Sequence, residues 1–374
     1  MTFRLVELSG TPFEQGLAHG EALKDLIEHN VELYFYRFEK EAKLTREQTL
    51  SMAAKVARHF EKFSPAFSEG MRGISQSSGR NFFEIAALNA RYEILYYQYG
   101  TVGLEKNGLT RVTASPEHRR PDGCTLFAAL PEATASGQLT MGQNWDWIEN
   151  VKGALLRTKH HDGLETLGFT EAGIFAPKLG LNSAGLGLCI SGLTSMDDDW
   201  SRQARPTHAR CWEILRSTSL EQAKSVIDDG TKACSTNFMV ALSPDQAIDF
   251  ETAPHGIRMV SCSSGSMAHT NHFLDPQSLN IIEPPSERRP HSYHRQKRMT
   301  ELLQERRPLK LEDFKEFLAD RDDDPDGICR YPNLEEPVED RVATICGVIM
   351  NLETRTMWVA DGQPDVAPFT EYKL

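Results

Sequence analysis

Arg120-Pro121-Asp122-Gly123-Cys124-Thr125 stands where the pattern of the chain changes. The sequence before this stretch predicts helices almost throughout, and the sequence after it predicts strands and hairpins. A cysteine that directly follows a glycine at such a boundary is where a self-cleaving enzyme would carry its nucleophile. Taken alone, the stretch is equally a Pro-Asp-Gly turn before a buried cysteine at the start of a strand. The choice between these interpretations depends on the other segments of the sequence.

A cut between Gly123 and Cys124 would free an α-amino group on the cysteine. An α-amine has a pKa of about 7.7–8.0, close to neutral, so it can act as the general base for its own side chain. Glycine at position 123 tolerates backbone strain and lets the thiol reach the preceding carbonyl. The stretch therefore predicts a division into a helical pro-segment, residues 1–123, and a catalytic part, residues 124–374.

Composition and charge narrow the class of protein. The chain has 374 residues, is 40% hydrophobic and carries a net charge of −12, which argues against nucleic-acid and membrane-surface partners because both need a basic face. Its seven cysteines are odd in number, and no CxxC occurs. With no signal peptide or membrane span in the sequence, we expect a reducing, cytoplasmic location. The ending Glu371-Tyr372-Lys373-Leu374 resembles a peroxisomal address weakly, since Tyr372 stands where a small residue is usual.

Capping signatures place the helices of the first part. Thr11-Pro12-Phe13-Glu14 opens a helix expected to reach about Lys43, with Gly16 and Gly20 suited to close packing. Further helices are expected to start at Thr45, Ser64 and Asn81, and a polar loop is expected over Asn107–Asp122.

After Cys124 the period becomes that of strands. Strands are expected at Cys124–Leu130, Leu139–Trp147, Thr166–Phe175, Leu186–Leu193, Asn237–Leu242, Ala247–Glu251, Ile257–Ser261 and Met267–Thr270, with a final hairpin of Ala343–Leu352 and Thr356–Asp361. Helices are expected at Ala209–Asp229, Ser292–Gln304 and Leu311–Asp320. Clustered hairpins with separate helical blocks indicate an α+β fold, with antiparallel sheets and helices packed outside them.

Polar residues at predicted strand ends are the candidates for chemistry. Asp146, at the end of the strand after Cys124, could hold or orient the new ammonium; alternatively it forms an Asx turn. Asn271 lies in His269-Thr270-Asn271-His272, where a side-chain amide would make a neutral oxyanion donor. The two histidines also suggest a metal site, but no cysteine or carboxylate completes a set.

Basic residues later in the chain have two interpretations each. Arg330 could bind a substrate carboxylate or steady a thiolate, or it could pair with the acidic run Asp322–Asp326; Arg341 is its rival. Glu287–Arg298 is most simply a solvated helix start, although it offers a basic contact for an anionic cofactor such as coenzyme A. Gly180–Gly187 lacks the Lys-Ser/Thr of a phosphate loop and predicts a hairpin turn.

Taken in order, these segments resemble the isopenicillin-N acyltransferase-like proteins, the relatives of acyl-coenzyme A:6-aminopenicillanic acid acyltransferase among cysteine N-terminal nucleophile hydrolases. The resemblance covers nearly the whole chain and depends on the order and spacing of its motifs. These are Gly10-Thr11-Pro12 through His19-Gly20, Asp122-Gly123-Cys124-Thr125, Gly142-Gln143-Asn144-Trp145-Asp146, Gly180-Leu181-Asn182-Ser183-Ala184-Gly185-Leu186, His269-Thr270-Asn271-His272-Phe273-Leu274, Ile328-Cys329-Arg330 and Met357-Trp358-Val359.

The resemblance implies a four-layer αββα fold and a precursor that cuts itself before the cysteine. It matches Cys124 to the nucleophile, Asp146 and Arg330 to a supporting charged pair, and Asn271 to the oxyanion donor. Tyr331 stands where such proteins often carry His, which leaves the substrate end open. The family's activities range from acyl transfer to amide hydrolysis on small molecules. No cofactor is implied, and a coenzyme A thioester enters only as a potential substrate.

Three functional hypotheses follow. The first is an autoprocessed cysteine amidohydrolase or acyltransferase that acts on small N-acyl amides or acyl thioesters through a thioester on Cys124, its two fragments staying associated. The second is an unprocessed thiol hydrolase that pairs Cys124 with His269 or His272. The third is a catalytically retired fold that binds an acylated small molecule. The oligomeric state is not predicted.

Overall fold

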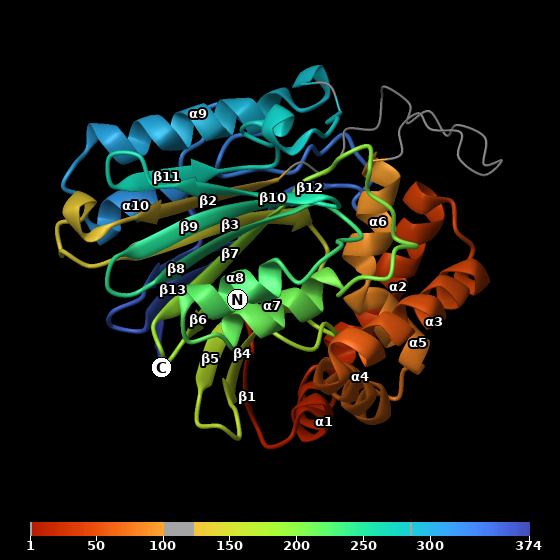
Figure 1. Cartoon of the computed structure of the whole chain (residues 1–374). Helices are drawn as coiled ribbons and strands as arrows, with labels where there is room; N and C mark the ends of the chain where they lie inside the picture. The colour runs from red at the N-terminus through yellow and green to blue at the C-terminus, as the bar shows by residue number, and fades with distance from the viewer. Residues whose placement is uncertain (1, 101–122, 285) are drawn as a thin grey trace.

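The computed structural model describes residues 2–100, 123–284 and 286–374, and two stacked sheets form the centre of this part of the chain (Figure 1). The eight-stranded sheet contains, in spatial order, β1 (Leu5–Ser9), β4 (Gly153–Lys159), β5 (Glu165–Glu171), β6 (Leu179–Asn182), β7 (Leu186–Gly192), β8 (Thr236–Leu242), β9 (Gln246–Ala253) and β10 (Gly256–Ser261). The six-stranded sheet contains β11 (Ser266–His269), β2 (Cys124–Ala129), β3 (Thr140–Ile148), β12 (Val342–Asn351), β13 (Thr356–Asp361) and β14 (Phe369–Lys373).

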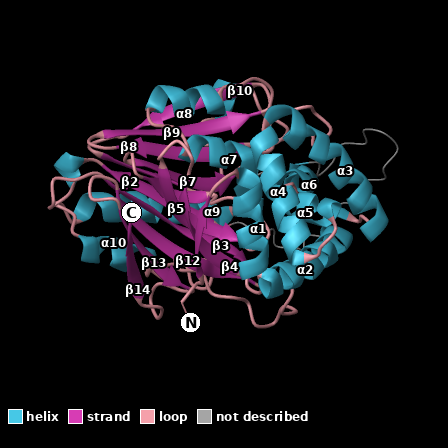
Figure 2. Ribbon diagram, turned by 90° about the horizontal axis from the view of Figure 1, so that it is seen from below, coloured by secondary structure: helices cyan, strands magenta, loops and turns pink. Residues whose placement is uncertain are grey.

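Helices cover both outer faces of the pair of sheets and one of its ends. Helices α9 (Pro290–Glu305) and α10 (Leu311–Leu318) lie on the six-stranded sheet, and α7 (Thr207–Leu215) and α8 (Leu220–Ile227) lie on the eight-stranded sheet. The end is covered by α1 (Pro12–Ala22), α2 (Lys24–Ala42), α3 (Arg46–Phe63), α4 (Pro65–Ser78), α5 (Phe82–Asn89) and α6 (Arg91–Gly100), which gather on one side in Figure 2. Short 3₁₀ turns occur at Pro131–Ala133, Pro276–Leu279 and Ser286–Arg288.

The apolar pattern of the strands explains why both sheet faces are covered. In β2, Leu126 and Ala128 point into the core between the sheets, whereas Phe127 and Ala129 pack beneath α9 and α10. Because successive side chains of a strand alternate between faces, a strand that is buried at every position, as β2 is, has a cover on each side. The four-layer αββα arrangement expected from the sequence is therefore confirmed.

Close packing of α1 on α4 separates α1 from α2. A side chain at Gly16 or Gly20 would collide with α4, at the Gly70 carbonyl or the Ser77 hydroxyl. The chain turns at Leu23, so the single helix expected from Thr11 to Lys43 is two helices. The expected close packing at Gly16 and Gly20 is confirmed.

A second expected helix, Ala209–Asp229, is also divided. Asn182 Nδ2 donates to the carbonyls of Leu215 and Ser217, at 2.9 and 2.8 Å, and so satisfies the end of α7. Ser219 then caps α8 by accepting from the Gln222 N–H at 3.2 Å.

The sheets differ from the expectation in two ways. The strands β4, β6 and β14 were not expected from the sequence. In addition, β1 pairs with β4 in parallel, whereas purely antiparallel sheets were expected.

A buried ionic cluster ties the segment before Cys124 to the sheets. Arg91 of α6 donates through Nε to Glu171 of β5 at 3.0 Å, and Tyr34 of α2 donates to the same carboxylate. Lys178 donates to it at 2.5 Å and lies 3.0 Å above the ring of Trp145. The Glu171 carboxylate thus joins α2, α6 and the eight-stranded sheet. Through Lys178 the cluster also lies against Trp145 of β3, the strand that pairs with β2.

Two further sequence expectations concern the polar loop before Cys124 and membrane-spanning helices. The expected polar loop Asn107–Asp122 lies wholly outside the described residues. Among the helices of the described ranges, none combines the length and apolar character needed to cross a bilayer.

Candidate active site

Cys124 is the first residue of β2 and lies in register with Trp145 of β3. Only 4% of its surface is exposed. Burial, together with the charge of nearby Asp146, raises the pKa of the Cys124 thiol to about 12. In the continuous chain this thiol is therefore protonated at neutral pH, and it needs a base before it can act as a nucleophile.

Gly123 brings three of the predicted residues together. A Cβ built on Gly123 would lie 2.5 Å from the Cβ of Asp146, 3.2 Å from its Oδ2, and 3.3 Å from Nη1 of Arg330. Glycine is therefore required here by close approach, rather than by the backbone strain expected from the sequence. The residue before Cys124 therefore lies next to a carboxylate and a guanidinium.

Thr344 connects Asp146 with Arg330. Its hydroxyl donates to Asp146 Oδ1 at 2.7 Å and accepts from the backbone N–H of Arg330 at 2.8 Å. Asp146 belongs to β3 and is 1% exposed, so the Asx-turn interpretation is wrong. The pairing of β12 with β3 shifts between Thr344 and Cys346, and this irregularity lies beside Asp146.

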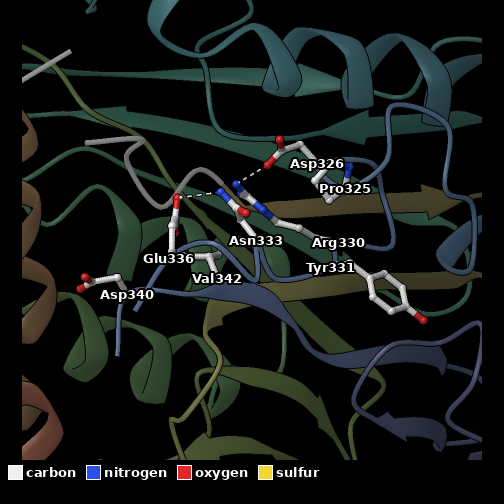
Figure 3. A pocket seen from close by; sticks show the side chains of 8 residues that line it. All are labelled: Pro325, Asp326, Arg330, Tyr331, Asn333, Glu336, Asp340 and Val342. Carbon is white, nitrogen blue, oxygen red and sulfur yellow. Dashed lines mark hydrogen bonds and ion pairs between the residues drawn. The ribbon is translucent and has the colours of Figure 1, made fainter. Parts of the chain in front are cut away.

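The contacts of Arg330 bear on one of its two interpretations. Its Nη2 donates to Asp326 Oδ1 at 2.6 Å, which confirms the expected ion pair with the acidic run. The same side chain flanks Gly123 and lines a small polar pocket (Figure 3). The rival Arg341 instead donates to the carbonyls of Glu336 and Leu334, each at 3.0 Å.

Asn271 follows β11 and approaches Cys124 through an arginine of α9. Its Nδ2 donates to the Gly192 carbonyl at 3.2 Å, and its Oδ1 accepts from Arg295 Nη2 at 3.3 Å. Arg295 Nη1 in turn donates to the Cys124 carbonyl at 2.6 Å. The amide predicted as an oxyanion donor therefore lies one side chain away from the predicted nucleophile.

The sequence of the chain matches one family model. Residues 133–366, more than half of the chain, match the acyl-coenzyme A:6-aminopenicillanic acid acyl-transferase family. The chain belongs to this family. The matched range contains Asp146, Asn271 and Arg330 and begins after Cys124. The protein is therefore an enzyme, an amide hydrolase or acyltransferase of the N-terminal nucleophile kind.

Solved structures resemble this family member more distantly. A variant of the conjugated bile acid hydrolase from Clostridium perfringens aligns with a TM-score of 0.45 and 12% identity, over 67% of this chain and 97% of that one. An N-acylethanolamine-hydrolyzing acid amidase ortholog from Caenorhabditis elegans aligns with a TM-score of 0.44 and 13% identity, over 67% and 100% of the two chains. Penicillin V acylase from Agrobacterium tumefaciens gives 0.38 and 10%, over 67% and 86%.

The two histidines near Asn271 are engaged with other groups. His269 lies between the Thr270 carbonyl, 2.9 Å from Nδ1, and Glu251 Oε1, 3.0 Å from Nε2. The His272 Nδ1 lies 2.8 Å from the Ser292 hydroxyl, and its ring stacks on Tyr293. Over the described ranges, His, Cys, Asp and Glu side chains form no group of three suited to a metal ion.

The basic stretch Glu287–Arg298 differs from the solvated helix start that its composition suggested. His294 and Arg298 face the acidic residues Asp322 and Asp320, at 2.9 and 2.7 Å. Other members of the stretch are buried against Asn271, namely Arg289, Ser292 and Arg295. Ser292 and Arg295 are three residues apart, and this spacing was the sequence signal that they share one face of the helix.

Proposed function

We propose that the protein cuts its own chain between Gly123 and Cys124 and then uses Cys124 to hydrolyse or transfer the acyl group of small amides. The observation that carries this proposal is the close approach of Asp146 and Arg330 to Gly123, which leaves no room for a side chain directly before a buried cysteine. A turn at the start of a strand would not need a carboxylate and a guanidinium on its peptide group. A self-cleaving peptide bond would need both, to hold the amine and to polarise the carbonyl.

The processing step is an acyl shift followed by hydrolysis. Cys124 Sγ attacks the Gly123 carbonyl carbon, the peptide C–N bond breaks, and the thiol proton goes to the leaving nitrogen. Water then cleaves the resulting thioester, which gives a carboxylate on Gly123 and restores the thiol. The new α-amine of Cys124 has a pKa of about 7.7–8.0, so it supplies the base that the buried thiol lacks in the uncut chain.

Turnover uses the same groups on an external acyl donor. The α-amine takes the thiol proton, the sulfur attacks the acyl carbon, and Nδ2 of Asn271 donates to the developing oxyanion. The amide C–N bond then breaks, and the ammonium of Cys124 returns the proton to the amine that leaves. Asp146 holds the ammonium that forms, while Arg330 steadies negative charge beside it. The acyl group remains on Cys124 as a thioester until water or an amine removes it.

Hydrolysis of a small N-acyl amide is the activity that the charges favour. The chain carries a net charge of −12, and basic residues of α9 such as His294 and Arg298 already face acidic side chains. A coenzyme A thioester carries several phosphate charges, so electrostatics favours it less as a donor. Transfer to an amine acceptor is then a conditional second activity.

The partition of the acyl group tests this proposal. The purified enzyme is loaded with an acyl amide or acyl thioester, and an added amine is varied. We expect a thioester on Cys124 by mass spectrometry and free acid as the main product. A new amide that rises with amine concentration until free acid is negligible would make the enzyme a transferase. The absence of any acyl-enzyme with every donor would contradict covalent catalysis.

A further inference from the structure

Three buried side chains at the start of α9 contact Asn271, one from Arg289 just before the helix and two from within it, Ser292 and Arg295. Arg289 Nη1 donates to the Asn271 carbonyl at 2.6 Å, and the Ser292 hydroxyl accepts from the Asn271 N–H at 3.0 Å. Arg295 Nη2 donates to Asn271 Oδ1 at 3.3 Å. Arg289 and Ser292 therefore hold the backbone of Asn271, whereas Arg295 contacts its side chain.

The contact with Arg295 decides which way the Asn271 amide points. A guanidinium has donors and no acceptor, so the amide atom that faces it must be the oxygen. Nδ2 then points the other way, to the Gly192 carbonyl at 3.2 Å. With the amide reversed, Nδ2 would meet the guanidinium and the acyl oxyanion would meet a carbonyl oxygen.

The same guanidinium also fixes Cys124. Arg295 Nη1 donates to the Cys124 carbonyl at 2.6 Å and to Thr125 Oγ1 at 3.1 Å. Arg295 is fully buried, and its planar group presents its donors in a rigid fork. One side chain thus sets the spacing between the residue that carries the thiol and the residue that carries the oxyanion donor.

We propose that Arg295 is a positioning residue that acts through Asn271 by locking the amide with Nδ2 directed at the oxyanion. This inference rests on the proposed function, in which Asn271 donates to the oxyanion. Because oxyanion donors act only when they are held in place before the reaction, a loosened amide loses most of its effect. Lysine in place of Arg295 would keep the charge and lose the fork.

The test compares Arg295→Lys with wild type as mature, processed enzymes. We expect kcat to fall about 10²-fold with KM changed by no more than about twofold, because the affected interaction strengthens in the transition state. Arg306→Lys is the matched control: it lies at the end of α9, its side chain is 46% exposed, and it pairs with Glu316. The control should keep wild-type kcat and KM. Wild-type kcat in Arg295→Lys would overturn the inference.

A double variant separates positioning from general structural support. In the Asn271→Ala background, Arg295→Lys should lower kcat by much less than about 10²-fold, because the amide that it orients is gone and only its contacts with Cys124 and Thr125 remain. Losses that multiply would contradict an action through Asn271. If wild type itself forms no acyl-enzyme on Cys124, the proposed function fails, and that outcome is separate from any result on Arg295.

Asn271→Asp tests the same contact without changing Arg295. This second variant keeps the inference testable if Arg295→Lys does not fold. Its carboxylate would face the buried guanidinium, so its Tm should equal or exceed that of Asn271→Ala, although turnover is lost. A Tm below that of Asn271→Ala would show that the guanidinium does not hold this side chain, and would overturn the inference.

Discussion

Glu171→Gln tests whether the segment before Cys124 is held to the sheets by the buried ionic cluster. The Glu171 carboxylate contacts Arg91 and Tyr34 from that segment and Lys178 from the loop before β6. Although burial raises the pKa of Glu171, the charges of Arg91 and Lys178 lower it further, from 4.5 to about 2. A shift of this size corresponds to about 3 kcal/mol of stability at neutral pH.

The dependence on pH makes this prediction specific. Because the folded-state pKa is depressed, the stabilisation is complete above pH 4.5 and is lost as pH falls toward 2. Urea unfolding should show a difference between wild type and Glu171→Gln of about 3 kcal/mol at pH 7 and about 1 kcal/mol at pH 3. Burial lowers the pKa of Lys178, and the charge of Glu171 opposes that shift, so the carboxylate keeps the ammonium charged.

A matched control uses an exposed ion pair between the same two parts of the chain. Glu7 pairs with Arg157 at 3.3 Å, and the Glu7 side chain is 62% exposed. Glu7→Gln should therefore change stability by less than about 1 kcal/mol. An equally small effect of Glu171→Gln at pH 7, or one that does not shrink in acid, would refute the role of the cluster.

The remaining predictions concern processing and turnover. Gly123→Ala should slow the cut at least about tenfold on gels, because its methyl group would lie 2.5 Å from the Cβ of Asp146; cutting at the wild-type rate would contradict the close approach. Asn271→Ala should fold and lose about 10²–10³ in kcat, and a neutral result would move the oxyanion donor to a backbone amide near Gly192. Cys124→Ser should still cut slowly and lose most turnover, since serine is the poorer nucleophile; wild-type turnover would exclude Cys124 as the nucleophile.

Much of the fold could be predicted because its signals are local. Capping boxes at Thr11, Thr45 and Asn81 begin helices in the structure. The continuous apolar run of β2 likewise predicted a strand. The helix breaks at Leu23 and after Leu215 depend on distant contacts, such as the Asn182 amide on the end of α7, and no local pattern reports them. The strand β6 has only four residues, too few for a period to be recognised.

The residues of the candidate site could likewise be predicted only in part. Cys124, Asp146, Asn271 and Arg330 stand in recognisable motifs, and the structure brings them to one region, although their roles stay predictions. Other contributors come from segments without a motif. Thr344 acts through a hydroxyl in an apolar strand, and Arg295 lies in a stretch whose charges suggested solvent. Which face of α9 is buried depends on the six-stranded sheet beneath it, and sequence alone does not contain that contact.

Intact mass with N-terminal sequencing of the purified protein tests the central claim most directly. If Cys124 cuts the bond before it, wild type should consist of two fragments of roughly 14 and 28 kDa, in proportion to their lengths. The larger fragment should begin Cys124-Thr125-Leu126, and Cys124→Ala should remain one chain. A fully active wild-type protein that remains one intact chain would contradict this account.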